Sequence, residues 1–311
     1  MRLVFLGTPA FAVPTLEAIV RAGHEVAAVL TQPDRPRGRG QNPAASPVKL
    51  AALEFALPVY QPERVRRPEA VEYLRGIGAR AMVVVGYGQI IPQSVIDLAP
   101  LGIINVHASL LPKYRGAGPV QWAIVNGETR TGVTTMQIDA GLDTGAMLLK
   151  AETEISPAEN AIELGARLSV MGADLLVVTL SGLEVGTIVA EKQDDAQATL
   201  APLLKKEDGL IDWMRPAPAI HNLVRGLQPW PGAQTTFRGQ PLHIWKSRVG
   251  VSGQLEEPGT VLHARPLTIA CGQGALELIE VQMEGRKRIP AGDFANGQRL
   301  TENEKLGEAR I

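Results

Sequence analysis

The stretch Gly102-Ile-Ile-Asn-Val-His-Ala-Ser-Leu-Leu-Pro-Lys-Tyr-Arg-Gly116 joins an apolar strand to a polar loop. Side chains two residues apart on a strand point to the same face, so Asn105 and His107 should lie side by side where the strand ends. A second segment, Gly141-Leu-Asp-Thr-Gly145, places Asp143 between two glycines. An amide, an imidazole and a carboxylate together can move protons and stabilise an oxyanion. These three residues are the predicted catalytic group.

Around this stretch, residues 1–155 alternate short apolar runs with amphipathic helical patterns. Met82-Val-Val-Val85 is apolar without alternation, as expected of a strand covered on both faces. The pattern predicts an α/β fold with a doubly wound, mostly parallel, Rossmann-like sheet, which binds ligands at the carboxyl ends of its strands. The predicted strands are Leu3–Leu6, Glu25–Thr31, Ala81–Val85, Ile103–Val106, Gly132–Ile138 and Ala146–Ala151, and the predicted helices include Val13–Ala22, Pro47–Ala56, Ile91–Leu98, Pro119–Asn126 and about Pro157–Leu180.

The pattern changes from Lys206 onward. One predicted helix, Pro216–Leu227, precedes short strand candidates that are split by Gly and Pro, which indicates a small, OB-like β-barrel. We therefore expect a catalytic domain over 1–182, a linker over 183–205 with a short strand at Thr187–Lys192, and a C-terminal barrel over 206–311. The strand candidates are Thr235–Phe237, Leu242–Lys246, Gly259–His263, Leu267–Ala270 and Leu276–Val281.

Composition narrows the class of protein. The chain has 311 residues, is 45% hydrophobic and carries a net charge of −1, so any nucleic-acid contact must come from a local basic patch. A single cysteine, Cys271, excludes an intrachain disulfide and a cysteine-rich zinc site, and it reads as a small buried hydrophobe. The remaining histidines lack metal-ligand spacing, so no metal is expected. With no signal peptide and no run of about 18 apolar residues, a cytoplasmic protein without a membrane partner is expected.

The segment from Gln32 to Ser46 is rich in Arg, Pro and Gly and has almost no apolar residues. It predicts a long, mobile loop at the same carboxyl edge as His107. Arginines at this density suit phosphate contacts, and such segments can order on binding RNA; the alternative is a solvated loop. The candidate RNA contacts within this segment are Arg35, Arg37 and Arg39. Lys49 and Lys206 are further candidates outside it, and the alternative for the Lys205-Lys206 patch is a solvated face.

The loop that follows His107 offers two kinds of contact. Leu110, Leu111 and Pro112 present apolar surface that suits a flat ring system, and Lys113 and Arg115 offer positive charge. The alternative is an ordinary exposed loop with a proline turn.

With these motifs the sequence resembles the folate-dependent formyltransferases, and most closely those that act on methionyl-tRNA. The resemblance covers essentially the whole chain. It includes the segments Val4–Ala12, Gln32–Gly40, Asn105–Gly116, Gly141–Gly145 and Gln228–Ala233.

The resemblance implies transfer of the formyl group of 10-formyltetrahydrofolate, a co-substrate, to the free amino group of methionyl-initiator tRNA, for translation initiation. It implies a monomeric enzyme that needs no metal, with the loop over 33–46 against the acceptor stem. The implied catalytic residues are Asn105, His107 and Asp143, and the implied folate site is Ser109, Leu110, Leu111 and Pro112.

The expected mechanism is direct acyl transfer, in which Asn105 and a protonated His107 donate to the oxyanion and Asp143 assists the proton transfer. The acceptor stays open at this point. Amino-sugar nucleotide enzymes share the three residues and can carry an extra domain, glycinamide ribonucleotide enzymes usually lack a C-terminal barrel, and a formylfolate hydrolase module also shares them. An RNA-binding protein on this scaffold is a non-catalytic alternative. A nicotinamide oxidoreductase is disfavoured, because the loop after the first strand, Gly7-Thr-Pro-Ala-Phe-Ala12, lacks the G-x-G-x-x-G fingerprint.

Overall fold

The computed structural model describes residues 1–37, 42–250 and 256–307, and the chain forms two compact units. The units are not separated by a single cut in the sequence, because the chain passes from one to the other more than once. The first unit comprises Met1–Gly116, Arg130–Glu154 and Gly165–Ala201, and the second comprises Ala117–Thr129, Ile155–Leu164 and Pro202–Ile311.

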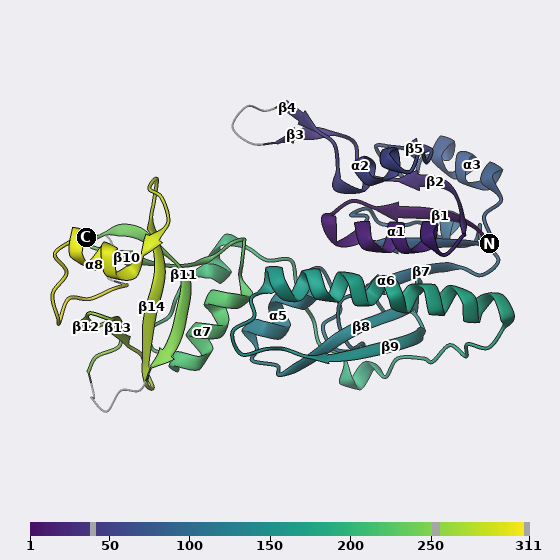
Figure 1. Cartoon of the computed structure of the whole chain (residues 1–311). Helices are drawn as coiled ribbons and strands as arrows, with labels where there is room; N and C mark the ends of the chain where they lie inside the picture. Colours follow the sequence, from purple (N-terminus) through teal and green to yellow (C-terminus); the bar gives the residue numbers. More distant parts are fainter. Residues whose placement is uncertain (38–41, 251–255, 308–311) are drawn as a thin grey trace. The chain divides into compact units, whose positions relative to one another are not determined.

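The first unit is built on a seven-stranded sheet in the order β5-β2-β1-β6-β7-β8-β9 (Figure 1). The strands from β5 to β7 are parallel, and β8 and β9 add antiparallel pairs at one edge. The predicted mostly parallel α/β sheet is thus confirmed. The strands are β1 (Arg2–Gly7), β2 (Glu25–Leu30), β5 (Val59–Tyr60), β6 (Ala81–Val85), β7 (Ile103–His107), β8 (Arg130–Gln137) and β9 (Met147–Glu154).

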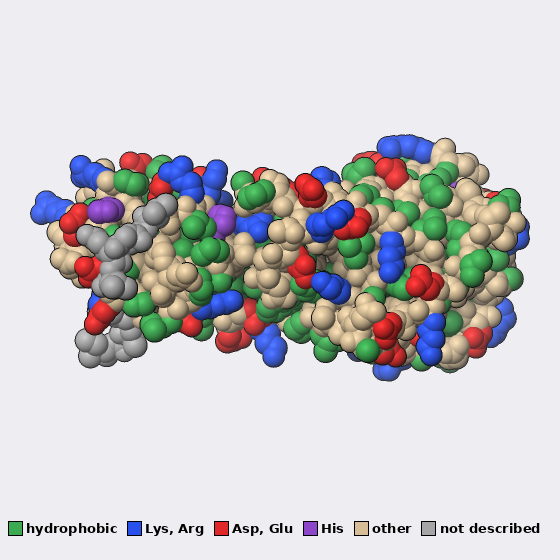
Figure 2. Space-filling view, turned by 90° about the horizontal axis from the view of Figure 1, so that it is seen from below, with side chains coloured by type: hydrophobic (Ala, Val, Ile, Leu, Met, Phe, Trp, Pro, Cys, Tyr) green, Lys and Arg blue, Asp and Glu red, His purple; other side chains and the backbone are tan. Residues whose placement is uncertain are grey.

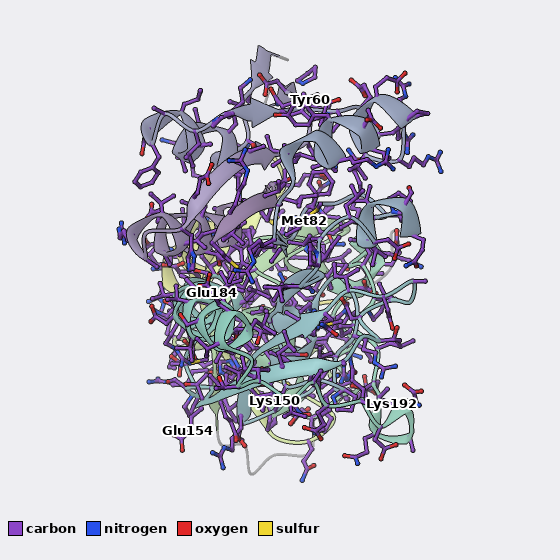
Figure 3. All side chains as sticks on the ribbon, turned by 90° about the vertical axis from the view of Figure 1, so that its right-hand side faces the viewer. Tyr60, Met82, Lys150, Glu154, Glu184 and Lys192 are labelled. Carbon is purple, nitrogen blue, oxygen red and sulfur yellow. The ribbon has the colours of Figure 1, made fainter. Side chains whose placement is uncertain are left out.

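Apolar side chains on both faces of this sheet explain why its inner strands lack alternation. Phe5 and Val83 pack on one side with Leu176 of a long helix, and Leu6 and Met82 pack on the other. The edge strand β9 does alternate, with Lys150, Glu152 and Glu154 exposed. Lys150 and Glu154 are labelled in Figure 3, and charges at an edge discourage pairing with other chains. The helices of this unit are α1 (Val13–Arg21), α2 (Pro47–Glu54), α3 (Pro68–Ile77), α4 (Gln93–Ile96) and most of α6 (Ala161–Val185).

The long helix α6 begins and ends later than predicted. The Asn160 side chain accepts hydrogen bonds from the backbone N–H of Ile162 and Glu163, and the Glu163 carboxylate accepts one from the Asn160 N–H, which fixes the first turn. The helix stops before Gly186, whose φ of +72° lies in the left-handed region that commonly ends helices. By length and composition alone α6 could cross a membrane, a test that a core helix also passes.

The second unit is built on an antiparallel sheet in the order β10-β11-β14-β13-β12, with β15 on β14. Lys305 and Leu306 bridge Thr260, next to β12, and Phe237 of β10, so one segment ties both sheet edges together. This confirms a C-terminal β-domain. Its elements are α5 (Pro119–Val125), α7 (Ala217–Gly226), β10 (Ala233–Phe237), β11 (Gln240–Gly250), β12 (Val261–Ala264), β13 (Leu267–Ala270), β14 (Ala275–Met283), β15 (Ile289–Pro290) and α8 (Ala291–Gly297).

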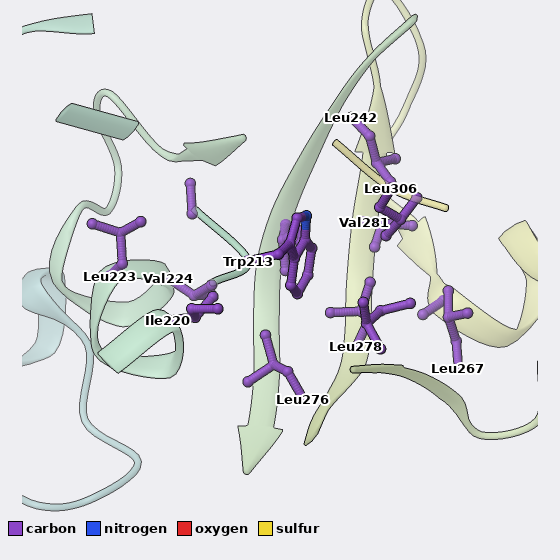
Figure 4. Close-up of a cluster of buried hydrophobic side chains, with 14 of the residues drawn as sticks. Trp213, Ile220, Leu223, Val224, Leu242, Leu267, Leu276, Leu278, Val281 and Leu306 are labelled. Atoms are coloured by element: carbon purple, nitrogen blue, oxygen red, sulfur yellow. The ribbon is translucent and has the colours of Figure 1, made fainter. Parts of the chain in front are cut away.

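The core of the second unit gathers around Trp213, whose indole N–H donates to Thr235 Oγ1 at 3.0 Å (Figure 4). Leu276, Leu278 and other side chains of the sheet pack in the same cluster. Cys271 is buried there, as predicted, and burial raises the pKa of its thiol to about 12, so the thiol stays protonated.

Two local predictions were wrong. The segment Thr187–Lys192 is not a strand, since among the described residues only Glu191 bridges to Met147. The loop after β2 is also not wholly irregular, because β3 (Arg35–Arg37) pairs with β4 (Asn42–Ala44) in a small antiparallel ribbon. The helices α3 and α8 were not among the predicted ones.

Candidate active site

Asn105 and His107 lie at the carboxyl end of β7, in the first unit. Antiparallel pairing with β8 sets Asn105 opposite Met136 and His107 opposite Thr134. Both side chains are nearly buried, with exposed fractions of 9% and 5%. No described residue hydrogen-bonds the Asn105 side-chain amide, which leaves its N–H groups for a bound molecule.

The His107 ring is held from both of its nitrogens. Nε2 lies 2.9 Å from the Tyr114 carbonyl oxygen, which can only accept, so Nε2 carries a proton. Nδ1 lies 3.6 Å from Asp143 Oδ2. With a proton on Nε2, Nδ1 has a lone pair that faces the lone pairs of the carboxylate, and these repel each other. A second proton placed between Nδ1 and the carboxylate removes this repulsion, so the arrangement suits a pair that holds or passes a proton.

The Asp143 loop is pinned at several atoms. The Gly116 N–H donates to Asp143 Oδ2 at 2.9 Å, and the backbone φ of Asp143 is +52°, in the left-handed region. The Asp139 carboxylate accepts from the Gly141 N–H at 3.0 Å and from Thr144 Oγ1 at 2.7 Å. These bonds fix a conformation that costs a non-glycine residue roughly 1–2 kcal/mol.

A substitution at Gly145 tests whether the Asp143 loop must pack closely against β8. A methyl group built on Gly145 would overlap the Gln137 carbonyl oxygen of β8, which cannot move without shifting the strand. We expect Gly145→Ala to lower the free energy of unfolding by about 1–3 kcal/mol and to reduce turnover as the Asp143 loop shifts. Urea denaturation and a transfer assay measure the two effects.

Gly165→Ala is the matched control for Gly145→Ala. A methyl group on Gly165, inside α6, meets nothing within 4 Å, so this change should leave turnover intact and stabilise the helix slightly. Equal stabilities of the two variants would show that the Gly145 contact is unimportant.

The predicted folate-site residues differ in accessibility. Ser109 and Leu111 are buried, with exposed fractions of 0% and 1%, so the prediction of exposed apolar surface is wrong for Leu111. Ser109 Oγ donates to the Lys113 carbonyl, and Leu111 packs on Met136. Leu110 and Pro112 are partly exposed.

The candidate RNA contacts are spread over both units. Arg35 is exposed on β3, and Lys206 is exposed in the second unit beside a pocket that Gln234 also lines. Lys49 Nζ lies 2.6 Å from Asp34 Oδ2, and this hydrogen bond lowers the pKa of Asp34. Arg37 lies on β3, with its side chain undescribed, and Arg39 lies outside the described residues.

Arg115 does not offer free positive charge. Its exposed fraction is 7%, its Nε donates to Gln193 Oε1 at 3.0 Å, and its Nη2 donates to Asp195 Oδ1 at 2.8 Å. Gln193, at 4% exposure, was missed by the sequence analysis, because a glutamine in a polar linker carries no signal. Within the described ranges, no cluster of three or more His, Cys, Asp or Glu side chains could hold a metal ion.

Comparison with known proteins covers both parts of the chain. Residues 1–180 match the formyl transferase family model, and residues 203–299 match the model of the formyl transferase C-terminal domain. A methionyl-tRNA formyltransferase from Solibacter usitatus is 83% identical over the full length of both chains. Another, from Koribacter versatilis, is 57% identical over 99% of each.

Solved structures share the fold at lower identity. HypX from Aquifex aeolicus, in complex with tetrahydrofolic acid, matches 98% of this chain with a TM-score of 0.66 and 15% identity, and this chain spans 48% of its length. An N-formyltransferase from Helicobacter canadensis, in complex with folinic acid and dTDP-3-aminofucose, matches 92% of this chain and 99% of its own, with a TM-score of 0.64 and 19% identity. The family models and the close relatives agree: this chain belongs to the formyl transferase family and, within it, to the methionyl-tRNA formyltransferases.

Proposed function

We propose that the chain transfers the formyl group of 10-formyltetrahydrofolate to the free amino group of methionyl-initiator tRNA, giving N-formylmethionyl-tRNA for translation initiation. The observation that carries this proposal is the meeting of Asn105, His107 and Asp143 at the end of β7, in a chain 83% identical to a methionyl-tRNA formyltransferase.

In the proposed mechanism the acceptor amine forms a bond to the formyl carbon, and the bond from that carbon to N10 breaks. Asn105 donates a hydrogen bond to the tetrahedral oxyanion, and a protonated His107 assists it. The Asp143–His107 pair takes the proton from the attacking amine and returns a proton to N10, so no net proton is lost. The buried ring and the partly buried carboxylate support this role, since a charge on either group is less screened than it would be in water.

The folate co-substrate is assigned to the loop after β7. Leu110 and Pro112 have free apolar surface for a ring system, whereas Ser109 and Leu111 would shape the loop from beneath. All four residues thus belong to the proposed folate site, two as contacts and two as supports.

The proposed division of the chain follows the predicted segments. Residues 1–182 would carry the catalytic side chains, 183–205 would link the two domains, and 206–311 would bind tRNA. The face in Figure 2 mixes basic and acidic side chains, in line with the net charge of −1, so RNA affinity would come from a few local cations. We also propose a monomeric, cytoplasmic protein without a membrane partner.

A transfer assay with radiolabelled 10-formyltetrahydrofolate tests the function. Charged initiator tRNA, charged elongator tRNA and an amino-sugar nucleotide are offered as separate acceptors. Label on the methionine of initiator tRNA alone supports the proposal. Label on the sugar nucleotide would overturn the acceptor assignment, and release of formate without transfer would indicate a hydrolase.

Two exposed cations are expected to act on tRNA binding alone. Arg35→Ala and Lys206→Ala should each raise the KM for tRNA several-fold and reduce the slope of log KM against log salt by about 1, because one phosphate contact is lost. The KM for the folate donor should stay unchanged. Arg66→Ala, an exposed arginine of the first unit outside the proposed contacts, is the control. Equal salt slopes for all variants would contradict these assignments.

A further inference from the structure

The Gln193 side chain binds two backbone carbonyls in the loop that carries Asp143. Its Nε2 lies 2.8 Å from the carbonyl oxygen of Asp143 and 2.8 Å from that of Gly145. A primary amide has two N–H donors, so this one group can satisfy both carbonyls. The two bonds lie at the left-handed turn of Asp143 and oppose its relaxation to an ordinary conformation.

Gln193 is itself held by a buried cation. Arg115 Nε donates to Gln193 Oε1, and Arg115 Nη2 pairs with Asp195. The Arg115 backbone is fixed too, since its N–H donates to the Thr199 carbonyl at 2.9 Å and its carbonyl accepts from the Ala201 N–H at 2.7 Å. The guanidinium therefore sets the orientation of the amide, with its oxygen toward Arg115 and its nitrogen toward the Asp143 loop.

The same arginine leads directly to the other anchor of Asp143. The residue after Arg115 is Gly116, whose N–H donates to Asp143 Oδ2. The backbone of Asp143 is thus held through Gln193 and its carboxylate through Gly116, and both anchors depend on the position of Arg115. All of these residues belong to the first unit.

We propose that Gln193 is a positioning residue for the transfer reaction, one that keeps the Asp143 carboxylate facing His107 Nδ1. The inference rests on the proposed function, since it takes Asp143 as a catalytic residue. The Gln193 side chain hydrogen-bonds neither His107 nor the Asp143 carboxylate, so it acts through the Asp143 backbone. The role requires donors toward the loop and an acceptor toward Arg115, and among side chains of this length only glutamine has both.

Removal of the Gln193 hydrogen bonds should lower the turnover number more than it weakens the binding of tRNA or folate. We expect Gln193→Ala to reduce kcat by about 10–100-fold, since small misplacements of catalytic groups have effects of this size, with the KM values for tRNA and folate changed less than about threefold. Gln193→Glu keeps the size and the bond from Arg115 but sets an acceptor against two carbonyl oxygens, so it should lose kcat as well. Gln197→Ala, on the same segment but bonded to Asp194 instead, should behave as the unaltered chain.

A double-mutant cycle with Asp143→Asn separates positioning from general structural damage. If Gln193 acts through Asp143, Gln193→Ala should cost less than about threefold in kcat once Asp143→Asn has already removed the carboxylate. Losses that multiply across the two sites would overturn the inference, as would a kcat of Gln193→Ala within about threefold of normal. Thermal unfolding of every variant shows whether it is folded at the assay temperature. If Gln193→Ala is unfolded at that temperature, Gln193→Glu replaces it in the cycle.

The cycle also distinguishes the inference from the function on which it rests. If Asp143→Asn itself leaves kcat unchanged, the catalytic assignment of Asp143 fails and the inference fails with it. If Asp143→Asn lowers kcat strongly and Gln193→Ala does not, only the positioning role is wrong.

Discussion

Replacement of His107 by alanine should lower the turnover number about 10²–10⁴-fold, the usual contribution of a positioned acid–base group. The imidazole lies 3.6 Å from the Asp143 carboxylate and is hydrogen-bonded through its second nitrogen, so its loss removes the proposed acid–base partner of Asp143. Single-turnover formyl transfer measures the effect without interference from product release.

The control for His107→Ala is His263→Ala. His263 is exposed in the second unit, where it lies 3.5 Å from the Glu302 carboxylate, and its removal should leave turnover unchanged. A loss of less than about tenfold for His107→Ala would contradict an acid–base role.

Replacement of Asn105 by alanine should lower turnover about 10²–10³-fold, as removal of one oxyanion donor does elsewhere. The amide has no partner among the described residues, so its removal leaves none of their polar groups unpaired and the fold should stay intact. The backbone pairing of β7 with β8 should also be retained in this variant, since it does not involve the Asn105 side chain. Transfer kinetics at saturating donor and tRNA measure the loss.

Asn105→Asp sharpens this second prediction. The carboxylate has nearly the same shape as the amide, but it lacks the N–H donor and brings a negative charge toward the oxyanion. It should therefore be at least as impaired as Asn105→Ala. Near-normal turnover of either variant would show that Asn105 is not the donor.

The sequence predicted those features that depend on local periodicity. The unbroken apolar run Ala81–Val85 is the strand β6 with the same bounds, and the i, i+2 spacing of Asn105 and His107 places both at the end of β7. The Gly141–Gly145 segment was recognised from its glycines, and the structure brings Asp143 to His107.

What the sequence could not provide depends on contacts between distant segments. Arg115 has the composition of a surface cation, and only the fold shows that Gln193 and Asp195, about 80 residues later, enclose it. Leu111 likewise appeared exposed because a loop sequence does not reveal the cluster with Met136 and Met147 that buries it. Contacts between residues so far apart in the chain produce no periodic pattern in the sequence.

The contacts that enclose Arg115 determine where the chain can be shortened. A fragment that stops at residue 182 would retain Asn105, His107 and Asp143, yet it would omit Gln193 and the backbone partners at Thr199 and Ala201. Such a fragment would keep every side chain of the proposed catalytic group but would lack the residues that hold the Asp143 loop in place. The sensible end point for a minimal catalytic fragment lies beyond Ala201.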